Sequence, residues 1–406
     1  MATTLAEVLR HFGPAYLRTH DLGTEAASAW RAIVACRTPA LGGQRWRCGD
    51  CGVEEWRWHS CRNRHCPQCQ ARDREAWRAA RLAELLDVPY CHLVFTLPHE
   101  LNALAGVHRR WVYETLMQCT AATLSTFAGD DKWLGGIGSF TLVLHTWTQE
   151  LRRHLHVHAL MACGALEDKA DDGQVAWLQP KKGPRFLFPV HALSKVFRGK
   201  FCDALVQAQA QGRLPRDAAT PAEQSSRLQA LRAKDWVVYA KTPLAGPAAV
   251  LDYLSRYTHR NAIGNERLVA IRGEQVLMKV RDNEHGGKRR LLAIDGQEFI
   301  GRLLLHVLPK GFKRIRHYGL LAPAAKAKRL QQARAALAMP QANPVAQEQV
   351  AEFMRRVAGI EIGRCPHCGG GRWQLHEQRS VDRQALAAMI PAQPTGQRPN
   401  GCRGPP

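Results

Sequence analysis

Two Cys-x-x-Cys pairs near the N-terminus constrain the fold of this 406-residue chain more than any other feature. The first pair is Cys48 and Cys51, and the second, after fourteen intervening residues, is Cys66 and Cys69. Two such pairs can supply four thiolates to one tetrahedral zinc ion, and metal binding then contributes folding free energy to a module without a large core. We therefore predict a zinc-ribbon-like module in which these four cysteines hold one Zn²⁺. Paired cysteines without an export signal also indicate a reducing cytoplasm.

Further candidate zinc ligands lie inside and beyond this module. Three residues between the two pairs can replace a ligand or build a second site: His59, Cys61 and His65. A third pair, Cys365 and Cys368, has no matching pair downstream, although Cys402 or His376 would complete a site there. The sequence leaves open whether this third pair binds zinc or consists of free thiols in a loop.

The charge of the chain suits a polyanionic partner. Lys and Arg number 57 against 35 Asp and Glu, which gives a formal net charge of +22. Each phosphate contact by Lys or Arg releases a counterion, so this excess favours nucleic acid, with a generally basic proteome as the alternative explanation. We expect no membrane association, because no run of eighteen apolar residues and no signal peptide is present.

Histidines alternate along a predicted strand over residues 154–162. On a strand, His154, His156 and His158 share one face, because alternate residues point the same way. Three imidazoles in register favour a divalent cation, and two of them leave coordination positions open for a scissile phosphate. Four residues are candidates for a third ligand: His145, Gln149, Glu150 and His259.

Two tyrosines follow on a predicted helix over residues 248–260. Tyr253 and Tyr257 are four positions apart and therefore share a helix face. Arg256 and Arg260 form a second pair on a neighbouring face, which suits contact with DNA phosphates. Core packing is the simpler interpretation of the tyrosines alone. The arginines, and a histidine strand that lacks a nucleophile, favour a catalytic role.

The order of these parts resembles the HUH-type rolling-circle transposases of the insertion-sequence-91 family. The resemblance covers residues 10–320 and rests on the cysteine module, an apolar strand at 93–97, the His156-Val157-His158 motif and the tyrosine motif. Residues 236–241 and 314–319 are also typical of the family. One mild departure is His154-Leu155, where members often carry His-Pro.

The resemblance implies a metal-dependent DNA strand transferase in a bacterial cytoplasm, associated with the nucleoid. His156 and His158 would hold Mg²⁺ or Mn²⁺ at the scissile phosphodiester of single-stranded DNA. Tyr257, Tyr253 or both would attack, leaving a 5′-phosphotyrosine and a free 3′-hydroxyl. No P-loop motif for ATP occurs in the chain, and the energy kept in the phosphotyrosine makes ATP unnecessary.

We expect an α+β fold in which an HUH-endonuclease-like antiparallel sheet, with the histidine strand in its middle, is flanked by helices. The predicted domains are 1–88, an N-terminal helix and zinc-binding module; 89–320, the catalytic domain; and 321–406, a basic helical region with a poorly ordered tail after residue 374. Residues 215–224 are predicted to be a linker.

Three other functions fit parts of the pattern. A plasmid replication initiator or a conjugative relaxase would share the histidines and tyrosines, although the zinc module favours a transposase. A zinc-ribbon DNA-binding protein without catalysis would use the same residues as core. A metal-dependent hydrolase would need carboxylates near the histidines, and none has a recognised spacing.

Overall fold

The computed structural model describes residues 3–69, 71–167, 175–183, 186–214, 220–241, 250, 262–282, 287–341 and 348–390. Its contacts divide the chain into two compact units. The first unit comprises Met1–Cys69, Gly264–Val307 and Val350–Pro406, and the second comprises Gln70–Ile263 and Leu308–Gln349. The three domains expected from the sequence stay a prediction, and each unit draws on more than one of them. None of the helices in these ranges is long and apolar enough to cross a membrane.

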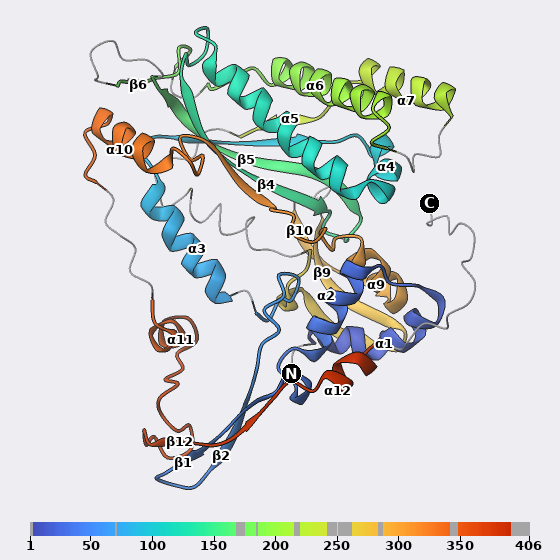
Figure 1. Ribbon diagram of the computed structural model, residues 1–406, viewed down its shortest axis with the longest axis vertical. Coiled ribbons are helices and arrows are strands. Elements are labelled where there is room, and N and C mark those ends of the chain that lie inside the picture. Colours follow the sequence, from blue (N-terminus) through green and yellow to red (C-terminus); the bar gives the residue numbers. More distant parts are fainter. Residues whose placement is uncertain are drawn as a thin grey trace. The chain divides into compact units, whose positions relative to one another are not determined.

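The second unit is built on an antiparallel sheet that has six strands among the described residues. Five of them lie in the order β11-β4-β5-β3-β7, and β6 pairs with β5 (Figure 1). The strands are β3 (Tyr90–Thr96), β4 (Ile137–Trp147), β5 (Arg153–Leu166), β6 (Trp177–Leu178), β7 (Val238–Ala240) and β11 (Ile315–Gly319). The predicted α+β class is confirmed, and the histidine strand, β5, lies in the middle between β4 and β3.

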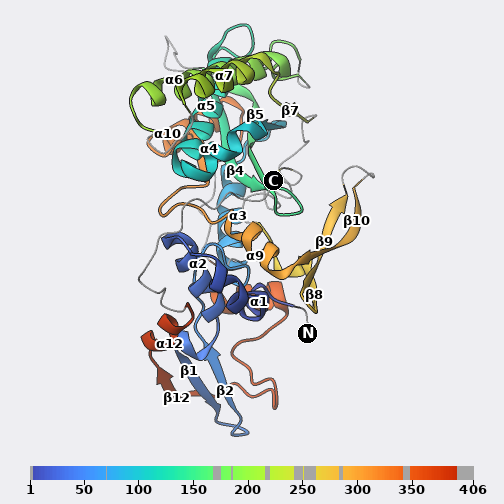
Figure 2. The same ribbon diagram turned by 90° about the vertical axis from the view of Figure 1, so that its right-hand side faces the viewer.

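Helices pack against one face of this sheet (Figures 1 and 2). They are α4 (Asn102–Val107), α5 (Arg109–Gly129), α6 (Val190–Ala210) and α7 (Pro221–Ala233). Leu155 and Val157 of β5 point into this core, where Phe95 of β3 contacts Phe197 of α6 edge to face at 5.2 Å. The apolar half of the alternating strand is therefore completely buried, and the histidines of β5 take the opposite face.

The opposite face carries a second buried cluster at the far end of β5. Leu160 and Ala162, which share the parity of the histidines, pack there with Leu86 and Leu320. Two helices cover this end of the face, α3 (Ala71–Glu84) and α10 (Lys326–Ala336). Among the described residues, the half of β5 that bears the histidines lies outside this apolar cluster.

Helices α4 and α5 are separated at His108, where φ and ψ are −111° and 46°. The predicted linker over 215–224 is wrong for its last residues, because α7 begins at Pro221. Thr220 and Glu223 form a reciprocal capping box there, which satisfies the first free backbone N–H groups of the helix. Residues 215–219 lie outside the described ranges.

The first unit contains two three-stranded sheets within the described residues, β12-β1-β2 and β10-β9-β8. Their strands are β1 (Gly43–Cys48), β2 (Glu54–Trp58), β8 (Leu268–Arg272), β9 (Gln275–Asp282), β10 (Lys288–Asp295) and β12 (Trp373–Arg379). The helices are α1 (Leu5–Thr19), α2 (Thr24–Ala35), α9 (Gly296–Leu304), α11 (Val350–Ala358) and α12 (Arg383–Ala388). The prediction of a poorly ordered tail after residue 374 is wrong as far as residue 390. β12 pairs antiparallel with β1, and Asp382 caps α12.

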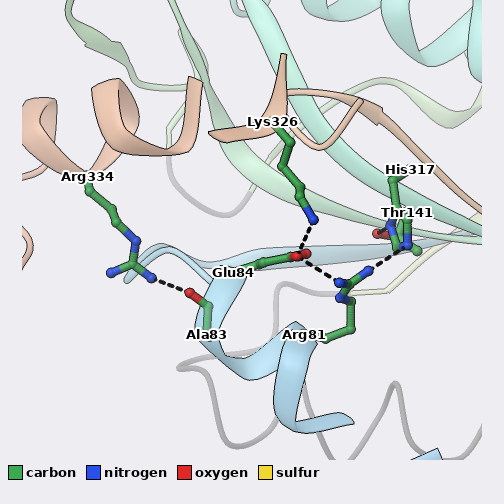
Figure 3. A network of polar contacts seen from close by, with 7 residues as sticks. All are labelled: Arg81, Ala83, Glu84, Thr141, His317, Lys326 and Arg334. Atoms are coloured by element: carbon green, nitrogen blue, oxygen red, sulfur yellow. Dashed lines mark hydrogen bonds and ion pairs between the residues drawn. The ribbon is translucent and has the colours of Figure 1, made fainter. Parts of the chain in front are cut away.

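Hydrogen bonds and ion pairs link α3 to the histidine face of the central sheet (Figure 3). Arg81 donates to Nε2 of His317 on β11 at 2.8 Å and to Glu84 at 2.7 Å. Because a guanidinium only donates, this nitrogen of His317 accepts, and its Nδ1 donates to Thr141 of β4 at 2.9 Å. Lys326 of α10 donates to the same Glu84 oxygen at 2.6 Å. His317 is therefore neutral in the folded chain.

This network makes the stability of the unit sensitive to acid. Burial, and then the charges of Arg81 and Lys326, lower the pKa of His317 to about 4. The unfolded value is about 6.5, so the stabilisation from neutral His317 is complete above that pH and is lost as the pH falls towards 4. In urea denaturation, the wild type should lose about 1–3 kcal/mol more unfolding free energy between pH 7 and 4.5 than His317→Gln. Parallel pH profiles for the two proteins would contradict this assignment.

Candidate metal centres

The register of the central sheet gathers three histidines on one face. His145 of β4 lies opposite His156 of β5, and Val143 lies opposite His158. His145, His156 and His158 each offer a ring nitrogen, and these atoms lie within 4.8 Å of one another. His154 shares this face of β5 but is not part of the cluster.

Among the sequence candidates for a third ligand, His145 is the one that joins His156 and His158. Gln149 and Glu150 lie in the turn between β4 and β5, and Glu150 is not in the cluster. His259 lies outside the described residues.

Hydrogen bonds orient the imidazoles of the cluster. Nδ1 of His156 lies 3.1 Å from the carbonyl oxygen of His154, to which it can only donate, so Nε2 carries the free lone pair. Nδ1 of His158 lies 2.9 Å from Nε2 of His92, a residue of β3 that is only 3% exposed. When this Nδ1 donates to His92, Nε2 of His158 also presents a lone pair to a metal ion. The ring of His145 stacks on Trp147 at 4.6 Å.

Burial keeps the imidazoles of His92, His156 and His158 neutral. Burial is the main cause of each shift, and it lowers the pKa of His156 to about 4 and that of His92 to about 3. Burial and the neighbouring imidazoles hold the pKa of His158 well below its ordinary value. Neutral rings with oriented lone pairs fit a divalent cation, because metal ions bind the unprotonated nitrogen. His92 was not identified from the sequence, although it directly precedes the apolar segment 93–97 and belongs to the same strand, β3.

The tyrosine motif falls outside the described residues. This applies to Tyr253, Tyr257, Arg256 and Arg260. Val250, which precedes them, is described and belongs to the same buried cluster as Leu160 and Ala162 of β5. Those two residues share the face of the histidines.

The cysteines of the first unit form two clusters, which corrects the prediction of a single site. Cys66 and Cys69 gather with Cys36 and Cys61, whereas Cys48 and Cys51 gather with Cys365 and Cys368. In each cluster the sulfur atoms lie within 4.8 Å of one another. The two N-terminal pairs therefore belong to different clusters. The first cluster includes Cys36 at the end of α2, and the second includes Cys365 and Cys368, which precede β12.

Other candidate zinc ligands fall outside both clusters. His59 and His65 are not members of either one, and His376 lies on β12 without joining the third pair. Cys402 lies outside the described residues. His376, one of the two candidate partners of Cys365 and Cys368, is therefore not in their cluster, and Cys48 and Cys51 take that place from upstream in the chain.

Two family models match the regions of the sequence that contain the histidine cluster and most of the clustered cysteines. Residues 8–97 match a family model described as a transposase zinc-binding domain, and residues 138–329 match one described as a putative transposase. The putative transposase y4qJ of Sinorhizobium fredii is 40% identical over 377 residues, which cover 91% of this chain and 93% of the relative. The chain belongs to the insertion-sequence-91 family of transposases. The histidine cluster thus lies within the transposase region, and most of the cysteines lie within the zinc-binding domain.

A more distant relative agrees with this placement. The transposase for insertion sequence element IS801 of Pseudomonas savastanoi pv. phaseolicola is 25% identical over 343 residues, covering 83% of this transposase and 80% of the relative. Among solved structures, the metal-bound conjugative relaxase TrwC in complex with oriT DNA is similar at 11% identity and a TM-score of 0.22, over 63% of this chain and 96% of that one. A TM-score this low does not establish a common fold.

Proposed function

We propose that this transposase nicks and joins single-stranded DNA through a 5′-phosphotyrosine intermediate, in rolling-circle transposition of an insertion sequence. The observation that carries the proposal is the cluster of His145, His156 and His158 on one face of the central sheet. In a member of a transposase family, three imidazoles whose ring nitrogens lie within 4.8 Å of one another suit a cation that contacts a phosphodiester.

His145, His156 and His158 are the residues that would hold the cation, Mg²⁺ or Mn²⁺. When bound, it polarises the scissile phosphodiester and lowers the cost of charge on its oxygens. The protein orients the ligands through His92 and the carbonyl of His154, and the buried apolar side of β5 fixes their spacing. Because all the ligands are nitrogen donors, we expect Mn²⁺ to support cleavage at lower concentration than Mg²⁺.

The nucleophile in this proposal is Tyr257, with Tyr253 as the second tyrosine. The phenol oxygen bonds to phosphorus while the bond from phosphorus to the 3′-oxygen breaks, and the phenol proton is balanced by the proton that the 3′-oxygen takes up. One phosphodiester replaces another, so no nucleotide triphosphate is consumed. Arg256 and Arg260 would contact DNA phosphates on either side of the break.

A gel assay tests the function directly. The full-length transposase is incubated with end-labelled single-stranded DNA carrying the terminus of its element, with Mn²⁺ or Mg²⁺. A DNA–protein adduct that resists SDS is expected, together with a free 3′-hydroxyl that a polymerase can extend, and EDTA should prevent both. DNA binding without any adduct under these conditions would favour the non-catalytic zinc-ribbon protein instead.

His92 should act as a positioning residue for the cation. Its contact with Nδ1 of His158 fixes the tautomer of that ligand, and loss of such a partner typically weakens metal binding by about 10–100-fold. We expect His92→Ala to raise the Mn²⁺ concentration for half-maximal cleavage by that factor, whereas His92→Gln, which keeps a hydrogen-bonding group, restores part of it. A loss of activity in His92→Ala that saturating Mn²⁺ leaves unchanged would argue against this role.

A further inference from the structure

The turns at Cys48–Cys51 and Cys365–Cys368, called knuckles below, have the same local structure. They lie more than three hundred residues apart in the chain. In each, a glycine directly follows the second cysteine and has a positive φ, 76° at Gly52 and 73° at Gly369. The N–H of this glycine donates to the carbonyl of the first cysteine at 2.9 Å, in Cys48 and in Cys365 alike. A side chain at such a φ is strained, so glycine fits both positions.

The hydrogen bonds at the start of each knuckle match as well. The N–H of Cys48 donates to the carbonyl of Val53 at 2.9 Å, and that of Cys365 donates to the carbonyl of Gly370 at 2.7 Å. Each bond joins positions five residues apart. The two knuckles therefore present their sulfur atoms in the same way.

The sulfur atoms of the two knuckles meet at metal-binding distances. Sγ of Cys48 lies 3.7 Å from that of Cys368, and Sγ of Cys51 lies 3.7 Å from that of Cys365. A tetrahedron with Zn–S bonds of about 2.3 Å has edges of about 3.8 Å. A disulfide would need about 2.05 Å, so the spacing fits four thiolates around one ion rather than two crosslinks.

The surrounding chain holds the knuckles together. Cys48 ends β1 and lies opposite Trp373, the first residue of β12. Next to this pair, the N–H of Gly49 donates to the carbonyl of Arg372 at 2.7 Å, and Nε of Arg372 donates to Asp50 at 2.6 Å. The metal-binding knuckles thus lie at the end of one continuous sheet, β12-β1-β2.

We propose that Cys48, Cys51, Cys365 and Cys368 bind a second zinc ion, separate from the cluster of Cys36, Cys61, Cys66 and Cys69. This ion completes the zinc ribbon, because it links the cysteines that precede the C-terminal strand β12 to those of the N-terminal hairpin. Residues 365–379 then belong to the zinc module, although the zinc-binding family match ends at residue 97. The full-length chain binds two zinc ions, and a chain truncated before residue 365 binds one.

Thiol protection in the unaltered protein tests the second zinc site without risk to folding. Cys51 and Cys368 are exposed, so as free thiols they should react readily with iodoacetamide. In zinc-loaded, full-length protein we expect mass spectrometry to find both unmodified, and to find both alkylated after chelation. Alkylation of these two residues at the rate of an exposed free thiol in zinc-loaded protein would overturn the proposal.

Zinc content gives the second measurement. Elemental analysis of the full-length protein should find two zinc ions per chain, and one in the variant Cys365→Ser with Cys368→Ser. Cys119→Ser is the matched control, because this buried thiol lies outside both clusters, and it should keep two. Cys368→His, which keeps a ligand, should also keep two. One zinc ion in the wild type, or unchanged zinc content in the double serine variant, would refute the second site.

Discussion

Replacing both tyrosines of the motif, Tyr253→Phe with Tyr257→Phe, should abolish the covalent DNA adduct. The change removes only the two hydroxyl oxygens, so single-stranded DNA binding measured by gel shift should stay within a few-fold of the wild type. A missing nucleophile lowers the rate of such reactions by on the order of 10³-fold or more, because water is neither positioned nor retained as a covalent link. The adduct band should fall below detection at every Mn²⁺ concentration.

A matched control is available on the histidine face itself. Tyr239 of β7 lies opposite Val94, which in turn lies opposite His158, and its side chain is 52% exposed. It is therefore an accessible phenol on the same face of the sheet, outside the tyrosine motif. Tyr239→Phe should form the adduct at the wild-type rate. An adduct that persists in the double variant and disappears in Tyr239→Phe would move the nucleophile to β7.

The sequence predicted local features of the second unit well. The alternation of His154, Leu155, His156 and Val157 was enough to predict β5 and its two faces, because side-chain alternation depends on neighbouring residues only. Local sequence alone did not select His145 from the four candidates as the partner of His156. It follows from the register of β4 against β5, which depends on contacts across the turn between them.

The cysteine pairing shows the same limit over a longer separation. Cys48 and Cys51 were assigned to the nearest pair along the chain, whereas the structure joins them to Cys365 and Cys368. One signal in the sequence favours the correct pairing. A glycine follows Cys51 and Cys368 but not Cys69, so the first and third pairs share the pattern Cys-x-x-Cys-Gly, and the second does not.

The error at the C-terminus has a related cause. The Gln- and Pro-rich composition of the tail after residue 374 suggested poor order, because a segment with few apolar residues has little to bury. β12 is instead paired along β1 and stacked with cations, and Arg57 lies 4.9 Å from the ring of Trp373. Its order depends on a partner strand more than three hundred residues away, which local composition does not reveal.

Loss of the cluster histidines should be as severe as loss of the tyrosines, but through the cation. His156→Ala and His158→Ala each remove one of three nitrogen donors, and we expect each to lower the rate of Mn²⁺-dependent cleavage by on the order of 10³-fold. DNA binding and the zinc content of the cysteine clusters should be unchanged, since these residues lie outside both cysteine clusters. The cleavage rate is measured with saturating single-stranded DNA over a range of Mn²⁺ concentrations.

His154→Ala provides the matched control for this experiment. His154 is on the same strand and face, and burial lowers its pKa as it does for His156, yet it is not in the cluster. The carbonyl that orients His156 belongs to its backbone and survives the substitution. Cleavage should therefore fall by no more than a few-fold. If His154→Ala were as damaging as His156→Ala, the cation would be held by the strand as a row of imidazoles, and the cross-strand cluster with His145 would not be its site.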